Sequence, residues 1–170
     1  MDAAGSRSQK SERQEMRRLT EKKKEEQEKR TGGRGPADFA EQIRRANESN
    51  PFMLHNHIRA VSLKETQAAV EAEIEPDSLN AMGSVHGGLM FVMAEVAAGL
   101  VTRNAGCRYV TLDSSFRFIK GSNSAKILLA EAVITKRGRT VCFARASVRE
   151  PGSGILLAEG DFTFYCLDAS

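Results

Sequence analysis

The feature that most constrains this chain is an apolar stretch from Leu89 to Val101 that carries one carboxylate, Glu95, near its middle. The stretch is about 13 residues long, whereas a helix needs roughly 20 to cross a bilayer. It has the length of a helix and is apolar on nearly all sides. We therefore expect a helix that is buried all round, not one that lies on a surface.

Strand-like segments lie on both sides of this helix. From Thr66 to Ile74 apolar and polar residues alternate, which predicts a half-buried strand. Four further strand candidates follow the helix, separated by short turns rich in Gly, Pro and Asn: Tyr109–Ile119, Lys126–Lys136, Thr140–Glu150 and Ile155–Cys166. Consecutive strands with short turns favour an antiparallel sheet. The expected fold class is α+β, with a curved antiparallel sheet wrapped around a long central helix.

The N-terminal part differs in composition from the rest. Residues 1–35 hold 11 of the 25 Lys and Arg residues and 7 of the 22 Asp and Glu residues, so the basic surplus belongs to this segment. We predict a charged, flexible or helical arm over 1–35 and one domain over 36–170. A tether to nucleic acid or an anionic membrane is the alternative, and we favour a solvated arm. Asp38 is expected to cap a short helix that ends near Asn50, and residues 51–63 give a mixed pattern.

The three cysteines are Cys107, Cys142 and Cys166. They are odd in number, widely spaced and without a CxxC pair, so we expect reduced structural thiols in a cytoplasmic protein. The charged N-terminus offers no secretory signal.

Two features point to chemistry. A lone carboxylate such as Glu95 is costly to bury in an apolar helix unless it is paired or used, so it is a candidate general base. The alternative is a glutamate that faces a basic group at a subunit contact. The loop His86-Gly87-Gly88 leads into the helix, where accessible backbone N–H groups suit an oxygen that gains negative charge. Asn80 could hold a water or a carbonyl, or only form a turn.

Other site types find no support in the sequence. The chain lacks GxSxG, P-loop and GxGxxG patterns. His55 and His57 lie two residues apart, but no Cys or carboxylate cluster completes a metal site around them. We therefore expect no metal and no cofactor.

The segment Leu79-Asn80, His86-Gly87-Gly88 and Glu95, followed by Val110-Thr111-Leu112-Asp113 and Gly138-Arg139-Thr140, resembles the hot-dog-fold acyl-CoA thioesterases. Within the 4-hydroxybenzoyl-CoA thioesterase superfamily, it looks most like the phenylacetic-acid-degradation type. The resemblance covers roughly residues 50–168 and implies hydrolysis of an acyl-CoA to a carboxylic acid and CoA. It also implies a homodimer or a dimer of dimers with active sites at the dimer interface.

The resemblance further implies a role for each site residue. Glu95 would act on the thioester carbonyl carbon, either as base for a water or as nucleophile. The backbone N–H of Gly87, with His86 and Asn80 of the partner subunit, would hold the thioester oxygen or position the water. Thr111 would lie near the catalytic acid.

The remaining residues are implied as substrate contacts. CoA is here a part of the substrate and no separate cofactor. The set is Gly88, Lys120, Arg137, Gly138 and Arg139, of which the last three would contact the CoA nucleotide.

The chain departs from this branch at one position, because Glu95 stands where Asp is usual. The choice between base and nucleophile therefore stays open, and so does the acyl group. The alternative function is a non-catalytic acyl-CoA sensor that pairs a basic tail with the same fold. A third option, a hot-dog dehydratase, would need a different His-containing helix motif, which the sequence lacks.

Overall fold

The structure is a computed structural model that describes residues 38–103 and 107–168. Its helices and strands follow one another along the chain without long gaps. They are α2 (Phe39–Ser49), α3 (Pro51–His55), β1 (Ile58–Leu63), β2 (Gln67–Glu73), the 3₁₀ turn η1 (Pro76–Ser78), α4 (Gly87–Arg103), β3 (Tyr109–Phe118), β4 (Ile127–Arg137), β5 (Val141–Arg149) and β6 (Leu156–Cys166).

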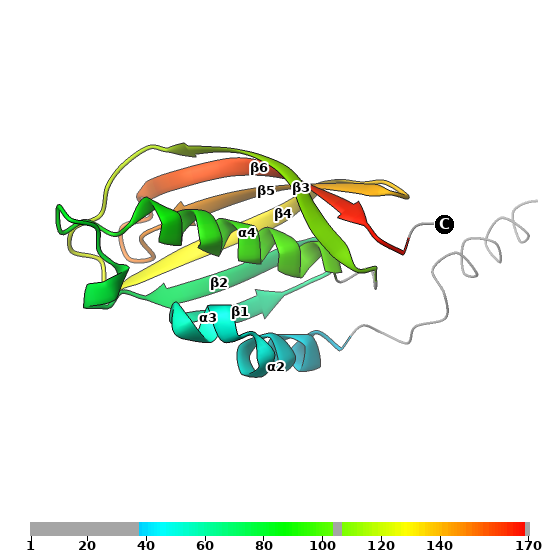
Figure 1. Ribbon diagram of the computed structural model, residues 1–170, viewed down its shortest axis with the longest axis horizontal. Coiled ribbons are helices and arrows are strands. Elements are labelled where there is room, and N and C mark those ends of the chain that lie inside the picture. The colour runs from blue at the N-terminus through cyan, green and yellow to red at the C-terminus, as the bar shows by residue number, and fades with distance from the viewer. Residues whose placement is uncertain (1–37, 104–106, 169–170) are drawn as a thin grey trace, which may run out of the picture. The chain divides into compact units, whose positions relative to one another are not determined.

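The six strands form one antiparallel sheet in the order β1-β2-β4-β5-β6-β3. The helix α4 lies across one face of this curved sheet and contacts all six strands (Figure 1). This confirms the predicted fold class. It also leaves β1 and β3 as the two edges, and β3 runs beside β6 alone within the described part of the chain.

Small side chains allow the helix to approach the sheet closely. The inward positions of the central strands include Ala130 and Ala132 on β4 and Ala144 and Ala146 on β5, all buried. The facing side of α4 is likewise rich in alanine at buried positions, namely Ala94, Ala97 and Ala98. Larger buried residues such as Met93, Leu128 and Phe162 fill the space around this contact. Close packing of this kind supplies most of the apolar burial that stabilises the domain.

The prediction that α4 is buried on all sides is wrong for the single protomer. Its sheet side is buried, whereas Val92, Glu95, Val96 and Leu100 on the other side are only half-buried. The sheet can cover only one side of a helix. The opposite side of α4 is bounded by residues of α2 and α3, which leave cavities beside it.

The short helices are fixed at their N-termini by side-chain caps. The Asp38 carboxylate accepts a hydrogen bond from the N–H of Glu41 at 3.0 Å, and the Asn50 side chain accepts one from the N–H of Met53 at 3.2 Å. The Asn47 amide then ties α2 to β1, because it donates to the carbonyl of Ala60 at 3.0 Å and accepts from its N–H at 2.7 Å. These contacts confirm the helix predicted from Asp38 and hold it over the edge of the sheet.

The expectation of three reduced thiols is wrong for two of them. Cys107 and Cys166 form a disulfide, with their Cα atoms 5.8 Å apart, and Cys142 is free and buried. The disulfide ties the segment before β3 to the last residue of β6. No helix within residues 38–103 and 107–168 has the length and apolar character to cross a membrane. The predicted arm over 1–35 lies outside the described residues, so the domain boundary stays a prediction.

Candidate active site

Glu95 lies on the half-buried side of α4 and is held by the edge strand. The Thr111 hydroxyl of β3 donates a hydrogen bond to Oε1 of Glu95 at 2.7 Å. Among the described residues, no Lys, Arg or His forms an ion pair with Glu95. Within one protomer the carboxylate is thus hydrogen-bonded and not ion-paired, and the alternative of a basic group at a subunit contact stays open.

A cavity of about 420 Å³ opens beside this carboxylate. Its walls come from α2, α3 and the exposed side of α4. Apolar and polar residues line it together: Gln42, Arg45, Ala46, Ser49, Asn50, Pro51, Met53, Glu95, Val96, Gly99, Leu100 and Arg103. A part-buried carboxylate beside a cavity with apolar walls has the layout of a site for a small organic substrate.

His86 precedes the first residue of α4 and acts as its N-terminal cap. Its ring nitrogen Nδ1 accepts a hydrogen bond from the N–H of Gly88 at 2.9 Å. A neutral imidazole that accepts at Nδ1 carries its proton on Nε2, so the exposed side of this ring offers a donor. A side chain at Gly88 would displace this ring, since a Cβ would lie 2.8 Å from Nδ1 of His86.

The N–H of Gly87 is the donor left over at this helix end. The N–H groups of Leu89 and Met90 donate to the carbonyl of His86, and that of Gly88 is taken by the imidazole. Within the described part of the chain, the N–H of Gly87 has no acceptor. It points from the positive end of a helix dipole, where a developing negative charge on an oxygen would be stabilised.

Asn80 forms a turn in the single protomer. Its side-chain oxygen accepts from the N–H of Met82 at 2.9 Å and from that of Ser84 at 3.2 Å. The amide nitrogen of the side chain has no acceptor within the described part of the chain. The turn interpretation of Asn80 therefore holds for the oxygen, while the NH₂ group can still donate to a ligand.

The carboxylate and the Gly87 donor lie apart in one protomer. They are eight positions apart on α4, which corresponds to roughly 12 Å of axial rise. His86 and Gly88 line a different cavity of about 330 Å³, together with His55, His57 and other residues. One thioester group cannot contact both places, because its carbonyl carbon and oxygen are directly bonded. The protomer thus contains two separate candidate half-sites, one at each cavity.

The basic residues implied as nucleotide contacts lie at the far end of α4 from Gly87. Arg137 donates from Nη1 to the carbonyl of Thr102 at 2.9 Å and from Nη2 to that of Val101 at 3.2 Å, so it caps the helix C-terminus. Gly138 is required by the turn between β4 and β5, since a Cβ would lie 2.8 Å from the Val141 carbonyl oxygen. Arg139 is exposed in the same turn.

Lys120 lies at the opposite end of α4 from this turn. It follows β3 in the segment that contacts the His86 loop, where the N–H of Val85 donates to the carbonyl of Ser122 at 2.8 Å. The structure therefore places Lys120 apart from Arg137 and Arg139. If all three residues contact one CoA, Lys120 must therefore come from a different protomer than Arg137 and Arg139.

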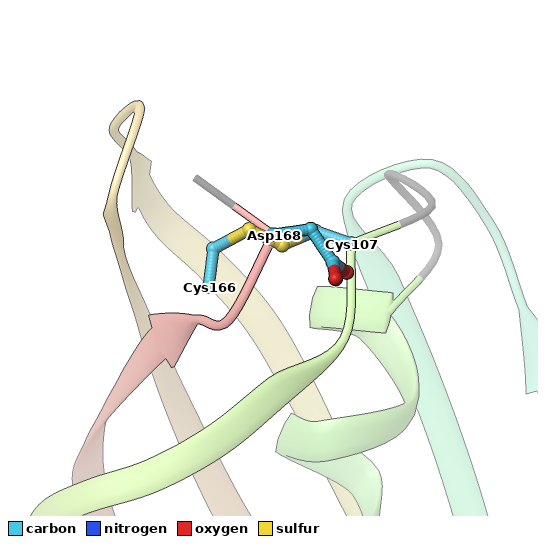
Figure 2. Close-up of side chains that lie close together, drawn as sticks. All are labelled: Cys107, Cys166 and Asp168. Atoms are coloured by element: carbon cyan, nitrogen blue, oxygen red, sulfur yellow. A yellow bond between two sulfur atoms is a disulfide. The ribbon is translucent and has the colours of Figure 1, made fainter. Parts of the chain in front are cut away.

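One group of potential metal ligands exists among the described residues: Cys107, Cys166 and Asp168, whose ligand atoms lie within 4.8 Å of one another (Figure 2). The two sulfur atoms are already bonded to each other. The Asp168 carboxylate accepts from the Arg108 side chain at 2.9 and 2.7 Å and from its N–H at 2.7 Å, and these bonds hold the pKa of Asp168 below its usual range. This donor set does not suit a metal ion.

Sequence reasoning missed the residues that α2 and α3 contribute to the cavity beside Glu95. The periodicity of residues 38–50 predicted a helix, but no local signal showed which part of α4 it would face. It also missed Phe118, whose ring would lie 3.0 Å from a Cβ at Gly87. Only the folded sheet brings the end of β3 to the start of α4.

Comparison with known sequences finds a matching family model. Residues 82–155 match the sequence model of the thioesterase superfamily, a segment that contains the His86 loop, Glu95 and Thr111. Human acyl-coenzyme A thioesterase 13 is 24% identical over 108 residues, which cover 62% of this chain and 77% of that protein.

Solved structures share the architecture. A mutant of the phenylacetic acid degradation protein PaaI from Thermus thermophilus superimposes with a TM-score of 0.65 at 25% identity, covering 69% of this chain and all of that one. The PaaI protein of E. coli gives a TM-score of 0.68 at 19% identity over 72% of this chain and 88% of that one, a similarity of fold alone. The resemblance drawn from the motifs is thereby confirmed.

Proposed function

Because residues 82–155 match the sequence model of the thioesterase superfamily, we propose that the chain hydrolyses acyl-CoA thioesters to a carboxylic acid and CoA. The observation that carries the proposal is the carboxylate of Glu95, half-buried beside a cavity and oriented by the Thr111 hydroxyl at 2.7 Å. The name of human acyl-coenzyme A thioesterase 13 supports the choice of substrate class.

We assign the chemistry as follows. Glu95 either removes a proton from a water that attacks the thioester carbonyl carbon, or attacks that carbon itself to give an anhydride that water then hydrolyses. Negative charge develops on the carbonyl oxygen, and the N–H of Gly87 and Nε2–H of His86 are the donors available for it. The C–S bond then breaks, and CoA leaves as a thiolate that takes up a proton.

A complete site requires two protomers in this proposal. The roughly 12 Å between Glu95 and Gly87 in one chain is removed if the Gly87 of the partner subunit lies opposite Glu95. The open edge of β3 supports this arrangement, because a strand at the end of a sheet presents unpaired N–H and C=O groups. Val110 and Leu112 on this strand are also 43% and 58% exposed, which is unfavourable unless a second copy covers them.

The test is the release of CoA from a panel of acyl-CoAs by the wild type and by Glu95→Gln. The near-isosteric amide cannot accept a proton or form an anhydride, so kcat should fall at least about 100-fold. Size-exclusion chromatography with light scattering checks that both proteins have the same oligomeric state. Unchanged turnover by a correctly assembled Glu95→Gln variant would show that Glu95 takes no part in the reaction. Tight binding of acyl-CoA by the wild type without turnover would favour the alternative function, a non-catalytic acyl-CoA sensor.

A further inference from the structure

The cavity beside Glu95 extends along α4 toward the C-terminal end of that helix. Arg103, the last residue of α4, lines the same cavity as Glu95. Eight positions separate them, which places their Cα atoms roughly 12 Å apart along the helix axis. The cavity thus joins a carboxylate to a guanidinium group.

The wall between these two charges is mainly apolar. Val96 and Leu100 from α4 and Met53 from α3 contribute to it, with Ala46 from α2. A chain of methylene groups or a pantetheine arm fits such a wall, whereas an isolated charge does not. The polar groups of a bound molecule would therefore concentrate near the two ends.

The two arginines of the cavity are in different electrostatic situations. Arg45 is paired with Glu41, its Nε lying 2.6 Å from a carboxylate oxygen. Arg103 is exposed, and no carboxylate within residues 38–103 and 107–168 forms an ion pair with it. The helix dipole alone favours a cation at this helix end. The dipole explains a cation at the end of α4, but it does not explain why Arg103 lines the same cavity as Glu95.

A second guanidinium strengthens the positive charge at this end. Arg137 donates to the carbonyls of Val101 and Thr102, the two residues before Arg103. The last turn of α4 therefore carries two cations. An anionic oxygen group of a ligand is the natural hydrogen-bonding partner of a guanidinium group.

We propose that Arg103 binds an anionic group of the substrate whose thioester lies at Glu95, which rests on the proposed thioesterase function. The anion has two possible sources on an acyl-CoA, and both use the same chemistry. One is a phosphate of the CoA nucleotide, and the other is a carboxylate at the far end of the acyl group. In both cases the cavity sets the distance between the anion and the thioester, so Arg103 determines specificity and takes no part in bond breaking.

Three compounds distinguish the sources: hexanoyl-CoA, adipoyl-CoA, which adds a terminal carboxylate at the same chain length, and hexanoyl-pantetheine, which lacks the nucleotide and its phosphates. Their kcat/KM values are measured with the wild type and with Arg103→Gln. If Arg103 binds the acyl carboxylate, the variant lowers the ratio of adipoyl-CoA to hexanoyl-CoA by about 10- to 100-fold. If it binds a phosphate, the ratio of hexanoyl-CoA to hexanoyl-pantetheine falls by the same factor. Arg103→Lys, which keeps the charge, should restore part of either loss.

Arg59→Gln is the matched control. Arg59 is an exposed arginine on β1 outside the cavity and pairs with Glu71 at 2.8 Å, so its loss should change neither ratio. The proposal is overturned if Arg103→Gln leaves both ratios within twofold of the wild type. Should the wild type hydrolyse none of the compounds, the proposed function fails. In that case calorimetry measures the affinity of the wild type and of Arg103→Gln for the same three compounds. Equal affinity of the two proteins, or no binding by either, refutes the proposed role of Arg103.

Discussion

The hydroxyl of Thr111 donates a hydrogen bond to Oε1 of Glu95 at 2.7 Å, which joins the edge strand β3 to the central helix α4 across 16 positions of sequence. The register of β3 against β6 shifts between Thr111 and Asp113, so one extra residue, Leu112, is accommodated there. Such a bulge re-aims the neighbouring side chains. The orientation of the Glu95 carboxylate by Thr111 therefore depends on this bulge in β3.

Replacing Thr111 by Val is expected to lower kcat about 10-fold with a smaller change in KM, because the valine keeps the volume but cannot orient the carboxylate. Thr111→Ser should recover most of the activity, since it restores the hydroxyl. Thr135→Val, at an exposed position of β4, is the control and should behave as the wild type. Equal kcat values for Thr111→Val and the wild type would show that Glu95 needs no such partner.

Replacing Gly88 and Gly99 of α4 by alanine should change the free energy of unfolding in opposite directions. In Gly88→Ala the new Cβ would lie 2.8 Å from Nδ1 of His86, so the imidazole must leave its capping position. We expect the free energy of unfolding to fall by about 1 kcal/mol. At Gly99 the new Cβ would meet only the Phe164 ring, at 3.9 Å, and Gly99→Ala should raise that free energy by about 0.5–1 kcal/mol through its helix propensity. Chemical denaturation measures both, and a loss of equal size in both variants would contradict the capping role of His86.

The sequence predicted α4 and the strands β2 to β6 because their patterns are regular. It missed β1, and the structure supplies the reason. The pairing of β1 with β2 shifts register between Ala60 and Ser62, so the alternation of Ile58–Leu63 breaks at Val61, which is 38% exposed. A search for residues that alternate with period two does not find such a strand, because the bulge interrupts the alternation.

The site was predictable in part for the same reason. Glu95 and the His86 loop stand out within one local motif, and the resemblance pointed to Thr111. The turn at Asn80 was one of the alternatives that the sequence left open, but the use of Arg137 as a helix cap depends on which carbonyl groups the fold brings near it. No spacing in the sequence contains that information. The place of Arg103 in the same cavity as Glu95 likewise depends on how α2 and α3 enclose it.

Deleting residues 1–35 is expected to leave kcat/KM within a few-fold of the full chain, because the candidate half-sites lie within residues 42–111. The ratio of kcat/KM between the truncated protein and the full chain should be the same at low and at high salt. A large loss of activity in a truncated protein that keeps its melting temperature would show that the arm takes part in substrate binding. A loss of the fold would show that the arm is structural.

The Cys107–Cys166 disulfide should contribute measurably to stability, since it closes a loop with a sequence separation of 59. Disulfides typically contribute about 2–4 kcal/mol, and Cys107→Ser or a reducing agent should lower Tm by roughly 10 °C. The reducing agent should have no further effect on the variant. Titration that finds all three cysteines of the native protein as free thiols would contradict the bond.

Acid should weaken the segment between β3 and β4 through Glu150. The Glu150 carboxylate accepts hydrogen bonds from the hydroxyls of Ser122, at 2.6 Å, and Ser153, at 3.1 Å, and these bonds lower the pKa of Glu150. A carboxyl whose pKa is lower in the folded state contributes stability above its unfolded pKa, near 4.5, and this contribution is lost as the pH falls through the folded value. Glu150→Gln should therefore be less stable than the wild type at pH 7.

The stability gap between the wild type and Glu150→Gln should then narrow as the pH falls below 4.5, which thermal melts at a series of pH values would measure. Because the carbonyl of Ser122 accepts from the N–H of Val85 in the His86 loop, loosening this segment should also raise KM on the acid side. A gap that stays constant from about pH 7 to about pH 3 would mean that the two serines do not hold Glu150 in its charged form.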